Sequence, residues 1–286
     1  MDNIAINVNT YKSSYKEALN EIKDTILKLN KNAKIFIFED SKNIDFNILE
    51  KCKMMISLGG DGTLLGTVRE IFHTGIPVLG INIGNLGFLT AGEINEKFEI
   101  LKSVFEGCYN IEERMMLECI VNDGYSKYYA LNDIVISKNI FSGIVRYGIE
   151  VDEELYTYFY GDGVVISTPT GSTAYSLSAG GPIVYPTLDT LSITPICSHT
   201  VGLRTLIAKG ESKIRISSSN ISDIVYLTID GQIYIEVNYL DKIILGKAKS
   251  TCKLIKLANQ DYFDILRKKI TYRSKEGDIN ENKQIE

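Results

Sequence analysis

The chain has 286 residues, 44% of them hydrophobic and 23% charged, and a formal net charge of −5 at pH 7. This length and composition fit one large or two medium-sized globular domains, and the acidic balance argues against the basic patch that a nucleic-acid partner requires. No apolar run reaches the roughly 18 residues of a membrane span. The N-terminus lacks the basic and apolar regions of a signal peptide, so we expect a cytoplasmic protein with no membrane partner.

The cysteines argue against both a disulfide framework and a zinc site. They are scattered and odd in number: Cys52, Cys108, Cys119, Cys197 and Cys252. No Cys-x-x-Cys pair occurs, and only His73 and His199 could add an imidazole ligand. We expect reduced, mostly buried thiols and no metal site built from side chains.

Residues 1–110 alternate between short apolar runs, which predict strands, and apolar residues three and four apart, which predict helices. The expected strands are Ile4–Val8, Lys34–Glu39, Met54–Leu58 and Pro77–Asn82. The expected helices are the stripe from Tyr15 to Leu29, Leu64–His73 and Glu96–Phe105. This alternation indicates an α/β domain with a parallel, Rossmann-like sheet.

Residues 111–258 contain short segments rich in β-branched and aromatic residues, separated by turns such as Asp123-Gly124 and Asp230-Gly231. The expected strands are Met116–Val121, Ala130–Ser137, Ile144–Val151, Val164–Thr168, Lys213–Ser217, Val225–Asp230, Ile233–Val237, Lys242–Leu245 and Lys253–Leu257. They predict an all-β domain of two packed sheets, a sandwich, with one helix near Ser172–Leu177. In residues 259–286 we expect a helix over Asp261–Lys269 that packs back on the first domain, then a disordered polar tail.

The most distinctive motif is Gly59-Gly60-Asp61-Gly62-Thr63, at the expected junction of a strand and a helix. Glycines there let backbone N–H groups approach a phosphate, and a helix N-terminus favours anions. A carboxylate among phosphates makes sense if Asp61 removes a proton from an attacking hydroxyl or helps to hold a metal. The alternative is an ordinary tight turn, because glycine and aspartate are common turn formers.

A second motif runs from Asp162 to Tyr175 and continues to Gly180-Gly181-Pro182. It gathers five hydroxyls, more than one helix cap needs, so we expect several to face a ligand. They are Ser167, Thr168, Thr170, Ser172 and Thr173. Tyr175 either stacks on a base or lies in the core.

Two further features have open alternatives. The Asn132-Asp133 pair interrupts a strand-like run, where it marks a bulge or turn, or binds a sugar hydroxyl or an adenine edge. Asp230-Gly231 is simplest as a hairpin turn. The alternating Tyr156, Tyr158 and Tyr160 predict a sheet face lined by phenol rings, either at the surface or at a subunit contact.

With these motifs in order, the chain resembles the NAD kinases, which phosphorylate the adenosine 2′-hydroxyl of NAD to make NADP. The matching segments are Gly59–Thr63, Gly80-Ile81-Asn82 with Asn85–Leu89, Asn132-Asp133, and Gly161–Pro182. The first motif also occurs in lipid kinases and distant phosphofructokinases, whereas the last block is specific to NAD kinases.

The resemblance implies a role for each matching residue. Asp61 would be the general base, and Gly59, Gly60, Gly62 and Thr63 would receive the phosphates of ATP with Mg²⁺. The implied NAD-binding residues are Gly60, Asp61, Gly62, Asn132, Asp133, Asp162, Thr173, Ala174, Tyr175, Ser178 and Asp230. The resemblance also implies NAD and ATP as ligands, and a homodimer or homotetramer in which Asp230 closes the site, from its own or a neighbouring subunit.

Three departures from the family pattern bear on donor choice and NADH acceptance. Many relatives have arginine where this chain has Tyr160 and Ile83, and the usual Arg-Pro is Arg204-Thr205 here. Two other functions remain open. A lipid kinase would need an apolar groove or a basic membrane-facing helix, neither of which is evident. A dinucleotide sensor without catalysis would have no need of Asp61.

Overall fold

A computed structural model gives the fold of the chain as two compact units. The structure describes residues 3–84, 87–122, 124–139, 143–218, 225–238, 241–258 and 260–269. The first unit comprises the described parts of Met1–Thr67, Ile76–Glu112 and Leu254–Glu286, and the second those of Val68–Gly75 and Glu113–Lys253. Each unit is considered by itself below.

The first unit is built on a seven-stranded sheet in the order β2-β1-β3-β4-β19-β6, with β5 beside β4. Its strands are β1 (Asn3–Val8), β2 (Lys34–Glu39), β3 (Met54–Gly59), β4 (Val78–Asn82), β5 (Gly92–Glu93), β6 (Tyr109–Arg114) and β19 (Cys252–Leu257). The β1–β2, β1–β3, β3–β4 and β4–β19 pairs are parallel. Parallel strands end at the same edge, so β3 and β4 bring Gly59 and Asn82 opposite each other there.

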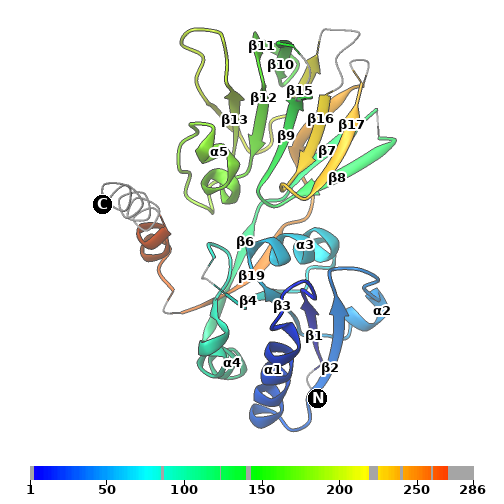
Figure 1. Cartoon of the computed structure of the whole chain (residues 1–286), viewed down its shortest axis with the longest axis vertical. Helices are drawn as coiled ribbons and strands as arrows, with labels where there is room; N and C mark the ends of the chain where they lie inside the picture. The colour runs from blue at the N-terminus through cyan, green and yellow to red at the C-terminus, as the bar shows by residue number, and fades with distance from the viewer. Residues whose placement is uncertain are drawn as a thin grey trace, which may run out of the picture. The chain divides into compact units, whose positions relative to one another are not determined.

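Helices cover both faces of this sheet. They are α1 (Tyr15–Leu29), α2 (Phe46–Leu49), α3 (Asp61–Ile71) and α4 (Lys97–Phe105), with 3-10 turns at Phe72–Thr74 and Ile94–Glu96. The apolar stripe of α1, including Ile22 and Ile26, packs with α4 against Ile6 and Ile56 (Figure 1). On the other face, Thr67 of α3 meets Asn7 and Ser57 through buried hydrogen bonds.

The second unit is a sandwich of two six-stranded sheets, drawn in green to orange in Figure 1. One sheet contains β7 (Leu117–Val121), β8 (Ser126–Ala130), β10 (Val145–Val151), β11 (Glu154–Gly161), β15 (Ile214–Ser218) and β18 (Ile243–Lys247). The other contains β9 (Asp133–Lys138), β12 (Gly163–Ser167), β13 (Thr190–Ile196), β14 (Leu206–Lys209), β16 (Val225–Ile229) and β17 (Ile233–Val237). All pairings within the two sheets are antiparallel.

Apolar side chains at alternate positions along the strands fill the space between the two sheets. Tyr147 and Phe159, on neighbouring strands, are buried and stack with ring centroids 5.5 Å apart. Two short turns, at Thr170–Thr173 and at α5 (Tyr175–Ser178), follow β12 where one helix was expected. The predicted fold class, an α/β domain followed by an all-β sandwich, is therefore confirmed.

Some details differ from the sequence-based expectation. Residues 253–257 were expected in the sandwich, but β19 joins the α/β sheet, where Leu254 pairs with Val78. A β-branched strand looks the same in either sheet, so its sequence could not reveal its neighbour. The strand β8 was not expected, because tyrosines and polar residues replace the usual β-branched run, whereas β11 carries the alternating tyrosines that predicted a sheet face. Residues 262–269 are helical, whereas Asp123 and the expected tail from Arg273 lie outside the described residues.

Within the described ranges, no helix has both the length and the apolar character needed to cross a membrane.

Candidate functional site

The Gly59–Thr63 segment, which we call the donor loop, joins the end of β3 to the start of α3. A Cβ added to Gly59 would overlap the side chain of Thr63, so the close turn depends on glycine. The Thr63 hydroxyl accepts hydrogen bonds from the side chain of Asn9 at 3.0 Å and from the backbone of Gly60 at 3.4 Å. The first amides of α3 lack carbonyl partners within the helix and so suit an anion.

A buried polar cluster fixes the start of α3 on the sheet. The Thr67 hydroxyl donates to the carbonyl oxygen of Thr63 at 2.8 Å and accepts from the side-chain amide of Asn7 at 2.7 Å. Its oxygen also lies 3.0 Å from the Ser57 hydroxyl. Because these groups are almost fully buried and mutually satisfied, shifting the donor loop would break several hydrogen bonds at once.

The carboxylate of Asp61 is held by backbone groups of the segment that follows β4. It accepts hydrogen bonds from the amides of Phe88 at 2.7 Å and Leu89 at 3.2 Å. A Cβ added to Gly87 would overlap this carboxylate. The predicted motif therefore does bring Asp61 and residues 87–89 together, while Asn85 and Leu86 lie outside the described residues.

Replacing Gly87 with alanine should displace the Asp61 carboxylate. Under the general-base role that the resemblance implies for Asp61, kcat should fall roughly 100-fold, since misplacing a reacting group by about 1 Å has an effect of that size. The kcat of Gly87→Ala measures it. Gly246→Ala is a matched control, because a Cβ there makes only an ordinary contact with Ser212 at 3.5 Å. An unchanged kcat in Gly87→Ala would show that the carboxylate can move without loss.

In the second unit, five of the predicted NAD-binding residues meet around one hollow, the acceptor pocket, of about 420 Å³. It is lined by Asn132, Asp133, Val135, Ser137, Ala174, Tyr175, Thr228, Asp230, Gly231 and Tyr234. The side chain of Tyr175 is about half exposed, so it is not a core residue. The sequence offered no specific signal for Ser137, Thr228 or Tyr234, which are ordinary strand residues in their patterns.

Two buried carboxyl groups, those of Asp133 and Asp230, line the acceptor pocket. Asp230 accepts hydrogen bonds from the backbone amides of Leu131 at 3.2 Å, Asn132 at 2.8 Å and Asp133 at 3.3 Å. Both Asp230 and Gly231 have positive φ angles, 49° and 65°, as the tight turn joining β16 to β17 requires. The hairpin prediction is confirmed, and Asp230 lies beside Asn132 and Asp133 of its own chain.

Burial and the neighbouring charge of Asp230 raise the pKa of Asp133 from 3.8 to about 7, although an N–H group of Tyr175 opposes the shift. Burial also raises the pKa of Asp230, against the effect of its amide donors and of Arg69. The site thus holds a carboxyl group that titrates near neutral pH, which is typical of functional sites.

The raised pKa of Asp133 predicts that the free energy of unfolding decreases as pH rises from about 4 to about 7. In that window the folded chain binds more protons than the unfolded chain, so the stabilisation is complete below pH 3.8 and lost through about pH 7. One such proton gives a slope of at most about 1.4 kcal/mol per pH unit. Urea denaturation of the native protein and Asp133→Asn from pH 5 to 8 measures it; equal slopes would contradict the prediction.

Four of the five hydroxyls of the Asp162–Tyr175 motif are not available to a ligand, contrary to the sequence-based expectation. Ser167, Thr168, Thr170 and Ser172 are buried. The Thr168 hydroxyl donates to the carbonyl of Leu131 at 2.5 Å, and that of Ser172 donates to the carbonyl of Pro169 at 2.7 Å. They brace the backbone around the pocket, because a buried hydroxyl needs a partner and finds one in the nearest carbonyl.

The remaining predicted residues do not line this pocket. Thr173 is a half-buried residue and Ser178 an exposed residue of the adjoining turns. Asp162 pairs with Lys138 at 3.1 Å. Strand β12 runs from Gly163, opposite Ser137, to Ser167, opposite Asp133, so Asp162 lies next to the Ser137 end of the pocket and roughly 17 Å along the strand from Ser167.

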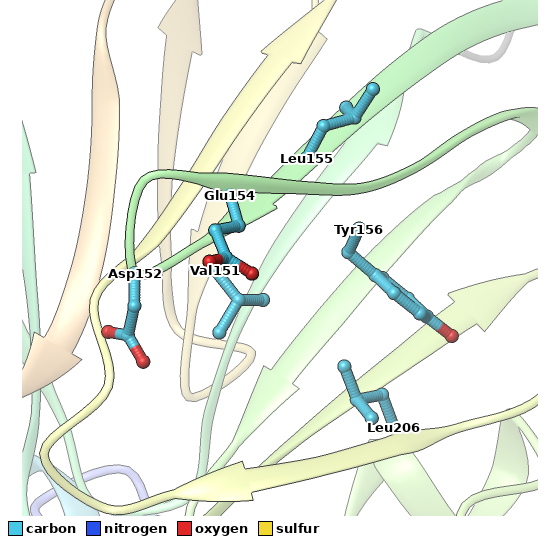
Figure 2. Close-up of a pocket in the computed structure, with 6 residues that line it drawn as sticks. All are labelled: Val151, Asp152, Glu154, Leu155, Tyr156 and Leu206. Atoms are coloured by element: carbon cyan, nitrogen blue, oxygen red, sulfur yellow. The ribbon is translucent and has the colours of Figure 1, made fainter.

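A second hollow, of about 520 Å³, lies at the hairpin between β10 and β11 and has Tyr156 and Leu206 at one end and Asp152 at the other (Figure 2). Asp152 accepts from the Lys213 amide and the Ser212 hydroxyl, both at 2.9 Å. The hydrogen bond from the Lys213 amide, and to a smaller extent that from the Ser212 hydroxyl, lower the pKa of Asp152. The Asp152 carboxylate thus stabilises the hairpin. No predicted site residue lines this hollow.

Comparison with known proteins covers almost the whole chain. Residues 2–109 match the family model of the ATP-NAD kinase N-terminal domain, and residues 131–257 that of the C-terminal domain. The NAD kinase of Clostridium botulinum (strain Kyoto / Type A2) is 47% identical over 278 residues, 96% of this chain and 99% of the relative. That of Clostridium kluyveri (strain NBRC 12016) is 42% identical over 283 residues, 98% of this chain and all of the relative.

Two solved structures share the fold. Yeast NADH kinase complexed with NADH superposes with a TM-score of 0.82 at 24% identity, covering 96% of this chain and 88% of that one. An NAD kinase from Archaeoglobus fulgidus in complex with ATP gives a TM-score of 0.75 at 23% identity, covering 94% and 98%. At these identities the likeness concerns the fold alone.

Proposed function

Because the chain belongs to the NAD kinase family, and is therefore a phosphotransferase, we propose that it transfers the γ-phosphoryl group of ATP to the adenosine 2′-hydroxyl of NAD. The products are NADP and ADP. The observation that carries this proposal is the placement of Asp61, a carboxylate held by two backbone amides at the first residue of a helix that follows a glycine-rich loop. A structural turn would not need a carboxylate fixed in this way at the start of a helix.

In the proposed reaction Asp61 acts as the general base. It accepts the proton of the 2′-hydroxyl as that oxygen forms a bond to the γ-phosphorus, and the bond from the γ-phosphorus to the bridging oxygen of ADP breaks. The amides of Gly59, Gly60, Gly62 and Thr63 hold the donor phosphates at the N-terminus of α3. Most of the rate then comes from positioning and from stabilising charge in the phosphate groups.

The acceptor pocket is proposed to bind the adenosine half of NAD. Asn132 and Asp133 contact adenine and ribose, and Tyr175 offers a half-exposed ring for stacking. The other proposed contacts, carried from the family resemblance, are Gly60, Gly62, Thr173, Ala174, Ser178, Asp230 and, for the nicotinamide half, Asp162. We also infer a cytoplasmic enzyme that associates as a homodimer or homotetramer.

The residues fit a magnesium ion held mainly by the donor. Among the described residues, no group of three or more His, Cys, Asp or Glu side chains could hold a metal. Mg²⁺ commonly binds through substrate phosphates, waters and one or two carboxylates, so no larger protein cluster is needed. Asp61 is the carboxylate of the donor loop that could reach it. When bound, Mg²⁺ would neutralise phosphate charge.

Purified protein incubated with NAD, ATP and Mg²⁺ should form NADP, detected with a dehydrogenase that accepts only NADP. Excess EDTA should abolish the signal, and excess Mg²⁺ should restore it. Parallel reactions with NADH, with polyphosphate and with other nucleoside triphosphates define acceptor and donor. NAD binding without NADP formation from any donor would favour a dinucleotide sensor, and absence of NAD binding would overturn the proposal.

A further inference from the structure

Arg69 lies near the end of α3 and contacts the turn that carries Asp230. One guanidinium nitrogen lies 3.4 Å from the Asp230 carboxylate, and another donates to the side-chain oxygen of Gln232 at 2.9 Å. The side chain of Asp230 is completely buried, and that of Arg69 is 13% exposed. Removing one partner of an ion pair this well shielded from water leaves a buried charge without compensation. The exposed pairs elsewhere on the sandwich contribute little to stability.

The same carboxylate connects Arg69 to the acceptor pocket. Its two oxygens accept from three consecutive backbone amides, those of Leu131, Asn132 and Asp133. In addition, the amide of Asp230 donates to the carbonyl of Asp133 at 3.0 Å. The entry into β9, where the predicted NAD contacts Asn132 and Asp133 stand, is therefore shaped by Asp230 as an ion. A protonated Asp230 could not accept all of these bonds equally well.

Two carboxyl groups, Asp133 and Asp230, face this small space, and Arg69 is the cation in salt-bridge contact with Asp230 among the described residues. Desolvation disfavours a buried charge unless it is paired and hydrogen-bonded. Without the guanidinium, three neutral amides alone would have to keep Asp230 ionised beside a second acid. Arg69 thus favours the charge state in which Asp230 holds the 131–133 backbone.

We propose that Arg69 is a positioning residue for acceptor binding, which acts through Asp230 on the backbone of residues 131–133 without touching the substrate itself. The proposed consequence for catalysis rests on the NAD kinase function above, whereas the effect on the backbone does not. Arg69 belongs to the same helix that begins with Asp61, but its action concerns NAD binding rather than the chemical step.

The test compares Arg69→Gln and Arg69→Lys with the native enzyme. Arg69→Gln should raise the KM for NAD about tenfold and change kcat and the KM for ATP less than about twofold, since it removes one charged partner of a buried group. The KM for NAD of Arg69→Lys should lie between those of the native enzyme and Arg69→Gln, because lysine keeps a point charge but loses the second contact to Gln232. Arg215→Gln is the matched control, removing an exposed pair with Glu150.

Amide hydrogen exchange without substrates provides a readout that is independent of the reaction. The amides of residues 131–133 should exchange at least about tenfold faster in Arg69→Gln, while core strand β12 keeps its native rates. Native KM for NAD or native exchange at 131–133 in a folded Arg69→Gln would overturn the proposal. If that variant does not fold, native values of both in Arg69→Lys would overturn it. If the native protein forms no NADP, the proposed function fails, and the exchange rates still decide the positioning role.

Discussion

Asp61→Asn should lower kcat for NADP formation by roughly 10²–10⁴, the usual contribution of a positioned general base. The carboxamide keeps the size of the side chain but cannot accept the proton of the 2′-hydroxyl. It can accept from only one of the amides of Phe88 and Leu89 that the carboxylate now satisfies. The dissociation constant for NAD should change little, because the proposed base contributes mainly to the transition state.

Steady-state kinetics and NAD titration of this variant separate the two effects. Asp24→Asn, an exposed carboxylate on α1, makes the same chemical change far along the chain from the donor loop and should leave kcat unchanged. Near-native kcat in Asp61→Asn would remove Asp61 from the base role. A large loss of NAD affinity with unchanged kcat would instead make it a binding residue.

Gly171→Ala should destabilise the folded chain by about 3 kcal/mol, at the upper end of overpacking effects. A Cβ at this buried position would overlap the backbone of Asn132, whose Cα would lie only 2.6 Å away. Backbone atoms cannot turn aside as a flexible side chain can. Either the turn at Thr170–Thr173 or the entry into β9 must move, and both belong to the proposed acceptor site, so NAD binding should weaken as well.

Urea denaturation and NAD titration test this expectation. Gly143→Ala is the matched control, since a Cβ there has no neighbour within 4 Å. Stability and affinity near those of the native chain in Gly171→Ala would mean that the contact between the turn and Asn132 is looser than the structure indicates.

Regular periodicity explains how much of the fold could be predicted. The helix α1 and the strand Lys34–Glu39 match the expected bounds, because the periodicity of their apolar residues is that of the element formed. Turn chemistry was equally informative at Asp230-Gly231. The strand that β19 pairs with was not predictable. Strand β19 joins the α/β sheet through contacts some 175 residues away in sequence, which no local pattern encodes.

Some residues of the candidate site could likewise be predicted from the sequence, and others could not. A glycine-rich motif pointed to Asp61, and a polar pair within a strand-like run pointed to Asn132-Asp133. In the structure Asp61 contacts Phe88, and Asn132 and Asp133 line the acceptor pocket with Tyr175. The buried hydroxyls were misjudged, because composition cannot distinguish a group facing solvent from one bonded to a neighbouring carbonyl. Arg69 gave no signal, since a single arginine near a helix end is usually a surface residue.

The position of β19 also sets an order of events during synthesis. Its residues, 252–257, leave the ribosome after every strand of the sandwich. At roughly 5–20 residues per second, β4 emerges roughly 8 to 35 s before β19, the strand that lies between β4 and β6. A nascent chain therefore carries the edge of β4 without its β19 neighbour throughout that interval, and the domain that begins first on the ribosome is the last to close its sheet.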